Sequence, residues 1–285
     1  MIERNVLLRT GLQMAYLCSD KVDPEKPNIV FVHGWQDNAA SFFNIVPLLK
    51  QSCNLWVVDL NGHGYSSHKG SESYYYFYDY VDDLASFLDE IQLHSLHLVG
   101  HSLGGLISAC YAAAFPAKVQ SICLIEALVP LYETAEATVQ RLRYGILSRD
   151  KQRNKNRRMM RSHEQAIQLR QRVTPIKETL LRPMIERGTE VTRSGVRWRH
   201  DPKLQTDSLF RLTQEQSKAI VTAVECSVTM ILGTDGFSSL KDPNIQAWYR
   251  NLTLHSVKGG HHCHLENPKS VAELIKGQIQ KVNTC

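Results

Sequence analysis

Hydrophobic runs of strand length recur along the chain and alternate with segments that have helical spacing. The runs are nearly continuous, as is typical of strands that are covered on both faces. They occupy residues 27–34, 54–62, 95–102, 120–127, 227–235 and 252–260, and apolar residues recur three and four positions apart in residues 41–50, 77–92, 106–116 and 270–282. This alternation predicts an α/β fold with a mostly parallel central sheet flanked by helices.

Two parts of the chain depart from this alternation. Residues 4–20 contain two apolar runs around Thr10 and Gly11, which predicts an antiparallel hairpin at the sheet edge. Between residues 128 and 218 the strand pattern disappears and the composition is helical. We therefore predict a core domain made of residues 1–127 and 219–285, with residues 128–218 inserted as a helical cap, or lid.

Composition is consistent with a cytoplasmic protein. The chain has 285 residues and is 43% hydrophobic, which is enough for one domain with an insertion. No segment reaches the roughly 18 apolar residues of a membrane span, and the N-terminus lacks the apolar run of a secretory signal. Seven scattered cysteines without a CxxC motif indicate reduced thiols. Either a monomer or a homodimer fits these observations.

The charge is concentrated in the middle of the chain. Residues 130–215 hold 19 Lys and Arg against 10 Asp and Glu, whereas the remaining residues hold 14 against 18. The excess could keep a lid soluble, select acidic acyl groups or contact nucleic acid. Because aromatic residues are not interleaved with the basic ones, we expect no nucleic-acid partner.

A serine between glycines follows the third hydrophobic run, in the sequence GHSLG at residues 100–104. Ser102 falls in a sharp strand-to-helix turn, which small neighbouring residues permit. Such a turn lifts the hydroxyl out of the sheet, and the Leu103 amide at the helix N-terminus can face a developing oxyanion. We interpret Ser102 as a nucleophile and Leu103 as an oxyanion donor.

A serine nucleophile needs a base, and GGHHCHLENPKS (residues 259–270) follows the last run. His261 comes directly after the two glycines and is best placed to reach over the sheet edge, whereas His262 should point the opposite way. His264 lies closer to the next helix. Adjacent ligands in this cluster cannot converge on one ion, so we expect no metal.

Two acids can orient the base. Asp235 follows the run at 227–235, in the chain order Ser, Asp, His, and Glu126 ends the run at 120–127 in an apolar setting that requires a partner. Both remain candidates on these grounds. The loop after residues 27–34 should supply the second oxyanion donor, the Trp35 amide. We expect Gly34, Trp35 and His101 to line the substrate pocket.

These segments together resemble the α/β-hydrolase superfamily. The resemblance is carried in order by HGW (33–35), DLNGHGYS (59–66), GHSLGG (100–105) and GHHCHLENP (260–268). More narrowly, HGWQDNAASF and ERGTEVTRSGVRWRHDPKL (186–204) are similar to the serine hydrolase-like proteins, which are related to haloalkane dehalogenases and epoxide hydrolases. Those enzymes use an aspartate nucleophile, whereas this chain has Ser102.

The resemblance implies a carboxylesterase-type serine hydrolase without a cofactor, acting on a small-molecule ester or lactone under a helical cap. It again selects His261, seven residues before a proline. Asp235 departs from the family spacing, and the serine hydrolase-like group commonly carries the acid at the position of Glu126, which we prefer. A carbon-carbon bond hydrolase of the meta-cleavage product type and a noncatalytic binding protein remain alternatives.

Overall fold

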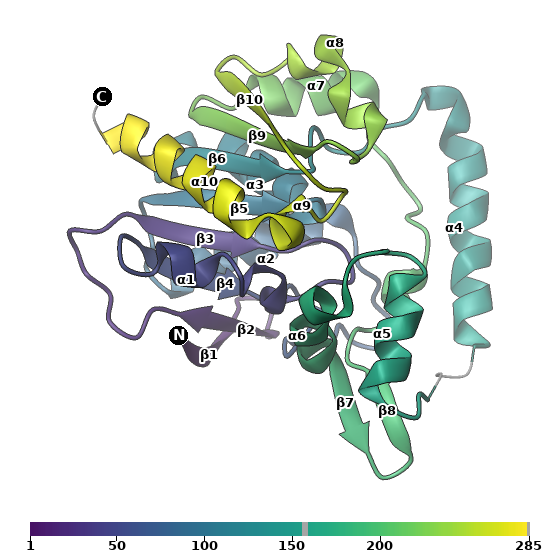
Figure 1. Ribbon diagram of the computed structural model, residues 1–285. Coiled ribbons are helices and arrows are strands. Elements are labelled where there is room, and N and C mark those ends of the chain that lie inside the picture. Colours follow the sequence, from purple (N-terminus) through teal and green to yellow (C-terminus); the bar gives the residue numbers. More distant parts are fainter. Residues whose placement is uncertain (156–158, 284–285) are drawn as a thin grey trace.

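Eight strands form a central sheet with helices on both faces in the computed structural model, which describes residues 1–155 and 159–283 (Figure 1). The strand order is β1-β2-β4-β3-β5-β6-β9-β10. Their bounds are β1 Ile2–Leu7, β2 Gln13–Cys18, β3 Asn28–Val32, β4 Asn54–Val58, β5 Leu96–His101, β6 Val119–Ile125, β9 Ser227–Gly233 and β10 Leu252–Val257. The pairs β1–β2 and β2–β4 are antiparallel, and the other neighbours are parallel. The predicted α/β fold and its edge hairpin are confirmed.

The core consists of two hydrophobic layers, one on each face of the sheet. Helices α2 (Phe77–Glu90) and α3 (Leu103–Ala114) cover one face, where Val30 and Val32 of β3 are buried. On the other face, Ile29 and Phe31 pack with α1 (Val46–Leu49) and α10 (Pro268–Asn283). Alternate residues of one parallel strand therefore serve both layers, which explains why the strands read as continuous hydrophobic runs.

The segment between β6 and β9 contains both helices and a hairpin. Its elements are α4 (Thr138–Arg153), α5 (His163–Gln171), α6 (Glu178–Gly188), β7 (Thr189–Thr192) and β8 (Gly195–Trp198). The expectation of a helical insertion did not include this hairpin, because β7 and β8, which pair with each other and bridge to Met160 through Val196, are too short and polar to give a strand pattern. The basic run at 148–162 includes residues 156–158, which lie outside the described residues.

The expected boundary after residue 218 falls inside a helix. Helix α7 (Gln214–Thr222) packs against α3, and Ser217 Oγ donates a 2.7 Å hydrogen bond to the carbonyl of Pro130. Since α7 continues the helical layer of the core, the segment that projects from the core ends before it. Residues 128–213 are called the insertion below.

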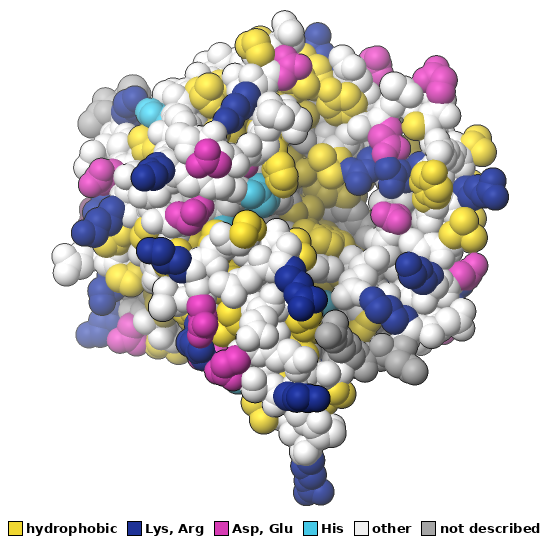
Figure 2. Space-filling model, turned by 45° about the vertical axis from the view of Figure 1, so that its right-hand side comes forward, with side chains coloured by type: hydrophobic (Ala, Val, Ile, Leu, Met, Phe, Trp, Pro, Cys, Tyr) yellow, Lys and Arg dark blue, Asp and Glu magenta, His cyan; other side chains and the backbone are white. Residues whose placement is uncertain are grey.

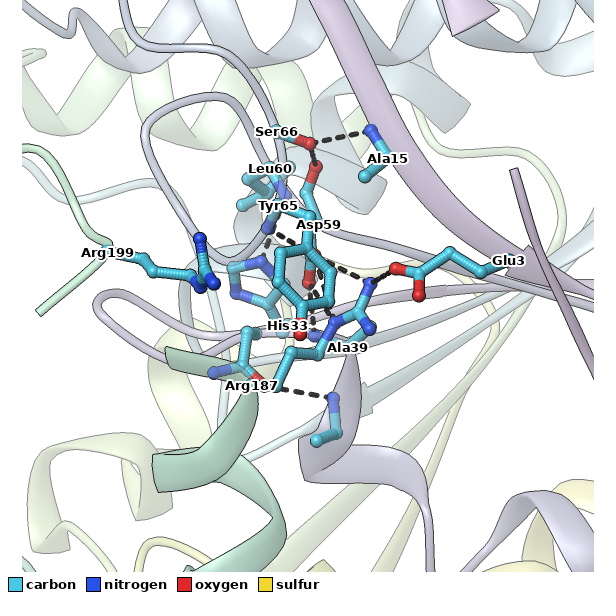
Figure 3. A network of polar contacts seen from close by, with 12 residues as sticks. Glu3, Ala15, His33, Ala39, Asp59, Leu60, Tyr65, Ser66, Arg187 and Arg199 are labelled. Carbon is cyan, nitrogen blue, oxygen red and sulfur yellow. Dashed lines mark hydrogen bonds and ion pairs between the residues drawn. The ribbon is translucent and has the colours of Figure 1, made fainter. Parts of the chain in front are cut away.

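A buried carboxylate joins the insertion to the core (Figure 3). Asp59 follows β4 and is fully buried, and Arg187 of α6 approaches its Oδ2 to 2.9 Å. The same guanidinium bonds Glu3 of β1 at 2.7 Å. Asp59 also accepts the amides of Ala39 at 2.7 Å and Tyr65 at 2.9 Å, so one side chain fixes two core loops and α6.

Two further features bear on the expectations from composition. Within residues 1–155 and 159–283, no helix combines the length and apolar character needed to cross a bilayer. The cysteines at positions 18, 53, 110, 123, 226 and 263 carry free thiols, and Cys285 lies outside the described residues.

Candidate active site

Ser102 occupies a strained turn between β5 and α3. Its backbone has φ 49° and ψ −117°, a left-handed conformation that is unfavourable for a residue with a side chain. The turn is held by the Ser102 amide, which donates to the carbonyl of Ile125 at 2.9 Å. A Cβ on Gly104 would lie 2.0 Å from the carbonyl oxygen of Val32, so glycine is required for α3 to approach β3.

His261 and Glu126 are in direct contact at the same edge of the sheet. His261 Nδ1 lies 3.2 Å from Glu126 Oε2, and because the carboxylate accepts, this ring nitrogen carries the proton. The other ring nitrogen, Nε2, then has a lone pair that can accept a proton. The carboxylate of Glu126 is fully buried, whereas the His261 side chain is 24% exposed.

The loop after β9 forms the remaining contacts of Glu126. The amides of Gly233 and Phe237 donate to its two oxygens at 2.7 Å and 3.3 Å. A Cβ on Gly236 would lie 2.1 Å from Glu126 Oε1, so this glycine leaves the space that the carboxylate occupies. The Phe237 ring packs on His261 with centroids 4.4 Å apart.

Asp235 lies in the same loop but points elsewhere. Its side chain is exposed and accepts a hydrogen bond from Thr234 Oγ1 at 3.1 Å, and its amide bonds the carbonyl of Gly259. The structure records no contact between its carboxylate and His261. Of the two candidate acids, Glu126 is therefore the one that the fold brings to the histidine.

Burial and hydrogen bonding shift the pKa values of Glu126 and His261 in opposite directions. Burial raises the pKa of Glu126, but the hydrogen bonds from His261, Gly233 and Phe237 outweigh it and place the pKa below its ordinary value. Burial lowers the pKa of His261, and the bond to Glu126 offsets this only in part. Near neutral pH the pair consists of a carboxylate and a neutral imidazole, as a general base requires.

The expected oxyanion donors follow the carboxyl ends of two neighbouring parallel strands, β3 and β5. Trp35 is in the loop after β3, and Leu103 begins α3. Within the described residues, neither amide has a hydrogen-bond acceptor. Ser102 Oγ likewise has no partner there; nucleophile–base hydrogen bonds often tighten only when substrate is bound.

Two of the three residues expected in the substrate pocket are buried instead. Trp35 is 37% exposed, but Gly34 is buried, and a Cβ at that position would lie 2.8 Å from the ring of His101. His101 is 1% exposed, and its Nε2 donates to the carbonyl of His261 at 2.9 Å. His101 therefore supports the backbone of the candidate base and does not face the solvent-accessible side.

A second buried carboxylate, which the sequence reasoning missed, lies beside His101. Asp37 Oδ2 is 3.5 Å from His101 Nδ1 and accepts a 3.2 Å hydrogen bond from His262 Nε2. Its other oxygen pairs with Arg170 of α5. A charged residue within the otherwise uncharged HGWQDN was the available signal, and His262 bonds this carboxylate whereas His261 bonds Glu126.

Asp37, His101 and His262 also form the one group within the described residues whose ligand atoms could hold a metal ion, all lying within 4.8 Å of one another. However, burial raises the pKa of Asp37 while Arg170 and His262 lower it, with a net value well below the ordinary one. The carboxylate is thus already balanced by a guanidinium. We assign the three side chains to a hydrogen-bonding network.

Comparisons with known proteins agree with this fold. The family described as "alpha/beta hydrolase fold" matches residues 27–268. The chain is 25% identical to a "Serine hydrolase-like protein" of Danio rerio over 88% of this chain and 81% of that protein. It is 29% identical to a "Probable serine hydrolase" of Drosophila melanogaster, covering 88% and 80% of the two chains. A hypothetical protein from Pseudomonas aeruginosa PAO1 superposes with a TM-score of 0.88 at 27% identity, over 100% of both chains.

Proposed function

The chain belongs to the alpha/beta hydrolase fold family, and from this premise we propose that it is a serine hydrolase that cleaves an ester or lactone through an acyl-enzyme on Ser102. The contact between Glu126 and Nδ1 of His261 is the observation that carries the proposal, because it leaves Nε2 free to act as a base. His261 and Ser102 belong to segments on the same edge of the sheet, at the carboxyl ends of parallel strands.

The reaction begins when His261 Nε2 removes the proton from Ser102 Oγ as the oxygen attacks the carbonyl carbon. Glu126 holds the ring in the tautomer with a proton on Nδ1 and stabilises the imidazolium that forms. His261 then gives its new proton to the leaving alcohol. Water repeats the same sequence on the acyl-enzyme and releases the acid, so no cofactor enters any step.

The amides of Trp35 and Leu103 stabilise the negative oxygen of the tetrahedral intermediate. Losing one donor of this kind lowers the rate by about 10² to 10³. Leu103 is favoured for this role because its amide is one of the unpaired donors at the N-terminus of α3, where the helix dipole attracts negative charge.

The surface supports a substrate with an apolar part. On the face in Figure 2 the molecule is hollowed, hydrophobic side chains cover the floor, and Lys and Arg side chains stand around the hollow. Phe237, which packs on His261, is 56% exposed, and Trp35, whose ring packs edge-on against His63 with centroids 5.7 Å apart, is 37% exposed. The Phe237 ring is available to an acyl chain near the candidate base.

The test is turnover of p-nitrophenyl esters from acetate to octanoate, together with labelling of Ser102 by a fluorophosphonate. We expect turnover and labelling by the wild type and neither by Ser102→Ala. Absence of both in a folded wild-type protein would overturn the proposal and favour a noncatalytic binding role.

A further inference from the structure

A cavity of about 390 Å³ separates the insertion from the core and does not include Ser102 or His261 in its lining. The core side is formed by Gln36, Asp37 and Asn38, and the insertion side includes Arg170 of α5 and Trp198 of β8. This volume lies within the range of small-molecule sites, which starts at roughly 300 Å³. The cavity can therefore hold part of a substrate whose ester group lies elsewhere.

Three positively charged residues, Lys155, Arg170 and Arg197, and one negatively charged residue, Asp37, line this cavity. Arg170 and Arg197 each have a carboxylate partner, Asp37 and Glu190 respectively. Lys155 also lines the cavity, but its ammonium donates only to the amide oxygen of Gln205 at 2.7 Å, and it has no carboxylate partner within the described residues. One unit of positive charge is left without compensation.

Two other groups at the cavity have unused hydrogen-bonding capacity. Arg170 Nε has no acceptor within residues 1–155 and 159–283, although a buried donor of this kind is costly to leave unpaired. His200 stacks on Trp198, and its ring makes no hydrogen bond within the same residues. Burial and the charges of Arg170, His68 and Lys155 lower the pKa of His200 to about 4, so the ring is neutral at pH 7 in an electropositive surrounding.

The cavity is lined by residues of the loop after β3, which also carries Trp35 of the candidate active site. Gln36 in its wall directly follows Trp35, the expected oxyanion donor, in the chain. Asp37 contacts His101, the residue before Ser102. The rest of the lining is largely apolar, with Leu169, Val173, Met184, Ile185 and Pro202. The cavity thus combines an apolar lining with a cationic, hydrogen-bonding group next to the loop that carries Trp35.

We propose that this cavity binds a terminal carboxylate on the acyl chain, so that the preferred substrates are monoesters of dicarboxylic acids, with Lys155 as the residue that determines this specificity. The inference rests on the proposed ester hydrolysis. A single uncompensated charge fits a single carboxylate, and the remaining donors of Arg170 and the neutral ring of His200 complete its hydrogen bonds.

The experiment compares mono-p-nitrophenyl adipate and suberate with p-nitrophenyl hexanoate and octanoate, which have the same chain lengths without the charge. We expect kcat/KM of the wild type to be roughly tenfold higher for the acidic esters, through KM, since charge-assisted hydrogen bonds discriminate by about this factor. Raising the salt from about 0.1 M to 1 M should reduce the preference, because ions screen the exposed ammonium.

Lys155→Met should bring the ratio of kcat/KM for the acidic esters to kcat/KM for the uncharged esters close to one. Lys155→Glu should lower this ratio below one. The matched control is Lys151→Met, in the last turn of α4 and outside the cavity, which should retain the wild-type ratio. Equal rates on both esters in the wild type, or the same loss of ratio in Lys151→Met, would overturn the inference. Failure to hydrolyse any ester is distinguishable, because it removes the proposed function as well.

Discussion

Asp37 of the core and Arg170 of the insertion form a buried ion pair that is continuous with the hydrogen bonds of the candidate base. The carboxylate is 2% exposed and the guanidinium 16%. The same carboxylate contacts His101, whose Nε2 holds the carbonyl of His261. The position of α5 and the position of His261 are therefore coupled through two side chains.

Asp37→Asn should weaken both the fold and the base. It leaves Arg170 without its counter-charge, so we expect the free energy of unfolding to fall by on the order of 3 kcal/mol. The charge of Asp37 also raises the pKa of His261, and its loss should move the acidic limb of the kcat/KM profile to lower pH. Denaturant unfolding and pH–rate profiles measure the two effects.

The control for Asp37→Asn is Glu190→Gln, which breaks the exposed pair with Arg197. An exposed pair contributes up to about 1 kcal/mol, so this variant should remain close to the wild type. Equal stability of the two variants, or a shift of the acidic limb to higher pH in Asp37→Asn, would contradict the proposed coupling.

Glu126→Gln and Asp235→Asn should differ sharply in activity. The amide in Glu126→Gln cannot hold the required tautomer of His261 by the same contact, and we expect kcat to fall by roughly 10³ or more. Asp235→Asn should stay within about twofold, because its side chain is exposed and has no recorded contact with the ring. Steady-state turnover of p-nitrophenyl butyrate decides between them. A larger loss in Asp235→Asn would return the role of the acid to that residue.

Gly236→Ala should lower activity by displacing the acid. The new methyl group would lie 2.1 Å from Glu126 Oε1, so the carboxylate must move away from its amide donors and from His261. We expect kcat to fall at least about tenfold, in line with the loss of a positioned catalytic group. Gly277→Ala in α10 is the control, since that Cβ meets no atom within 4 Å. It should keep full activity and raise stability by up to about 1 kcal/mol.

The pH dependence of the wild type should follow the lowered pKa of His261. The base acts in its neutral form, so the rate is lost as the pH falls through the pKa of this ring. Because burial lowers that pKa from 6.5, half of the maximal kcat/KM should be reached below pH 6.5. With a substrate that does not itself titrate, a midpoint above pH 6.5 would contradict this prediction. It would show that the contact with Glu126 raises the pKa of His261 by more than burial lowers it.

Local sequence patterns predicted the parts of the fold that depend on neighbouring residues. The strands, the hairpin at residues 4–20 and the turn at Ser102 each follow from a short pattern and from glycine chemistry. The acid could not be decided from the residues alone, because β6 and β9 are parallel neighbours and both candidates follow strand ends at one edge. The choice depends on which side chain turns inward, and the glycine at position 236 makes room for Glu126.

Long-range contacts were not accessible in the same way. Arg170 and Asp37 are 133 residues apart, and no local pattern links an arginine in α5 to a particular carboxylate. The burial of His101 was missed for the same reason, since its partners are the carbonyl of His261 and the side chain of Asp37. The sequence pattern could identify residues near the site but not which of them face the substrate.

The two buried arginine–aspartate pairs hold some helices of the insertion to the core more firmly than others. Arg170 and Arg187 fix α5 and α6 to the core, and separating either pair exposes a charge at a cost of several kcal/mol. Helix α4 has one buried residue, Gly145, and within the described residues its Arg149 meets the core through the rings of Tyr74 and Tyr76 and a 3.3 Å hydrogen bond to the Tyr76 hydroxyl. Contacts of this kind contribute about 1 kcal/mol or less each. Because the described contacts of α4 with the core are weaker than the ion pairs of α5 and α6, we expect any outward displacement of the insertion to begin at α4.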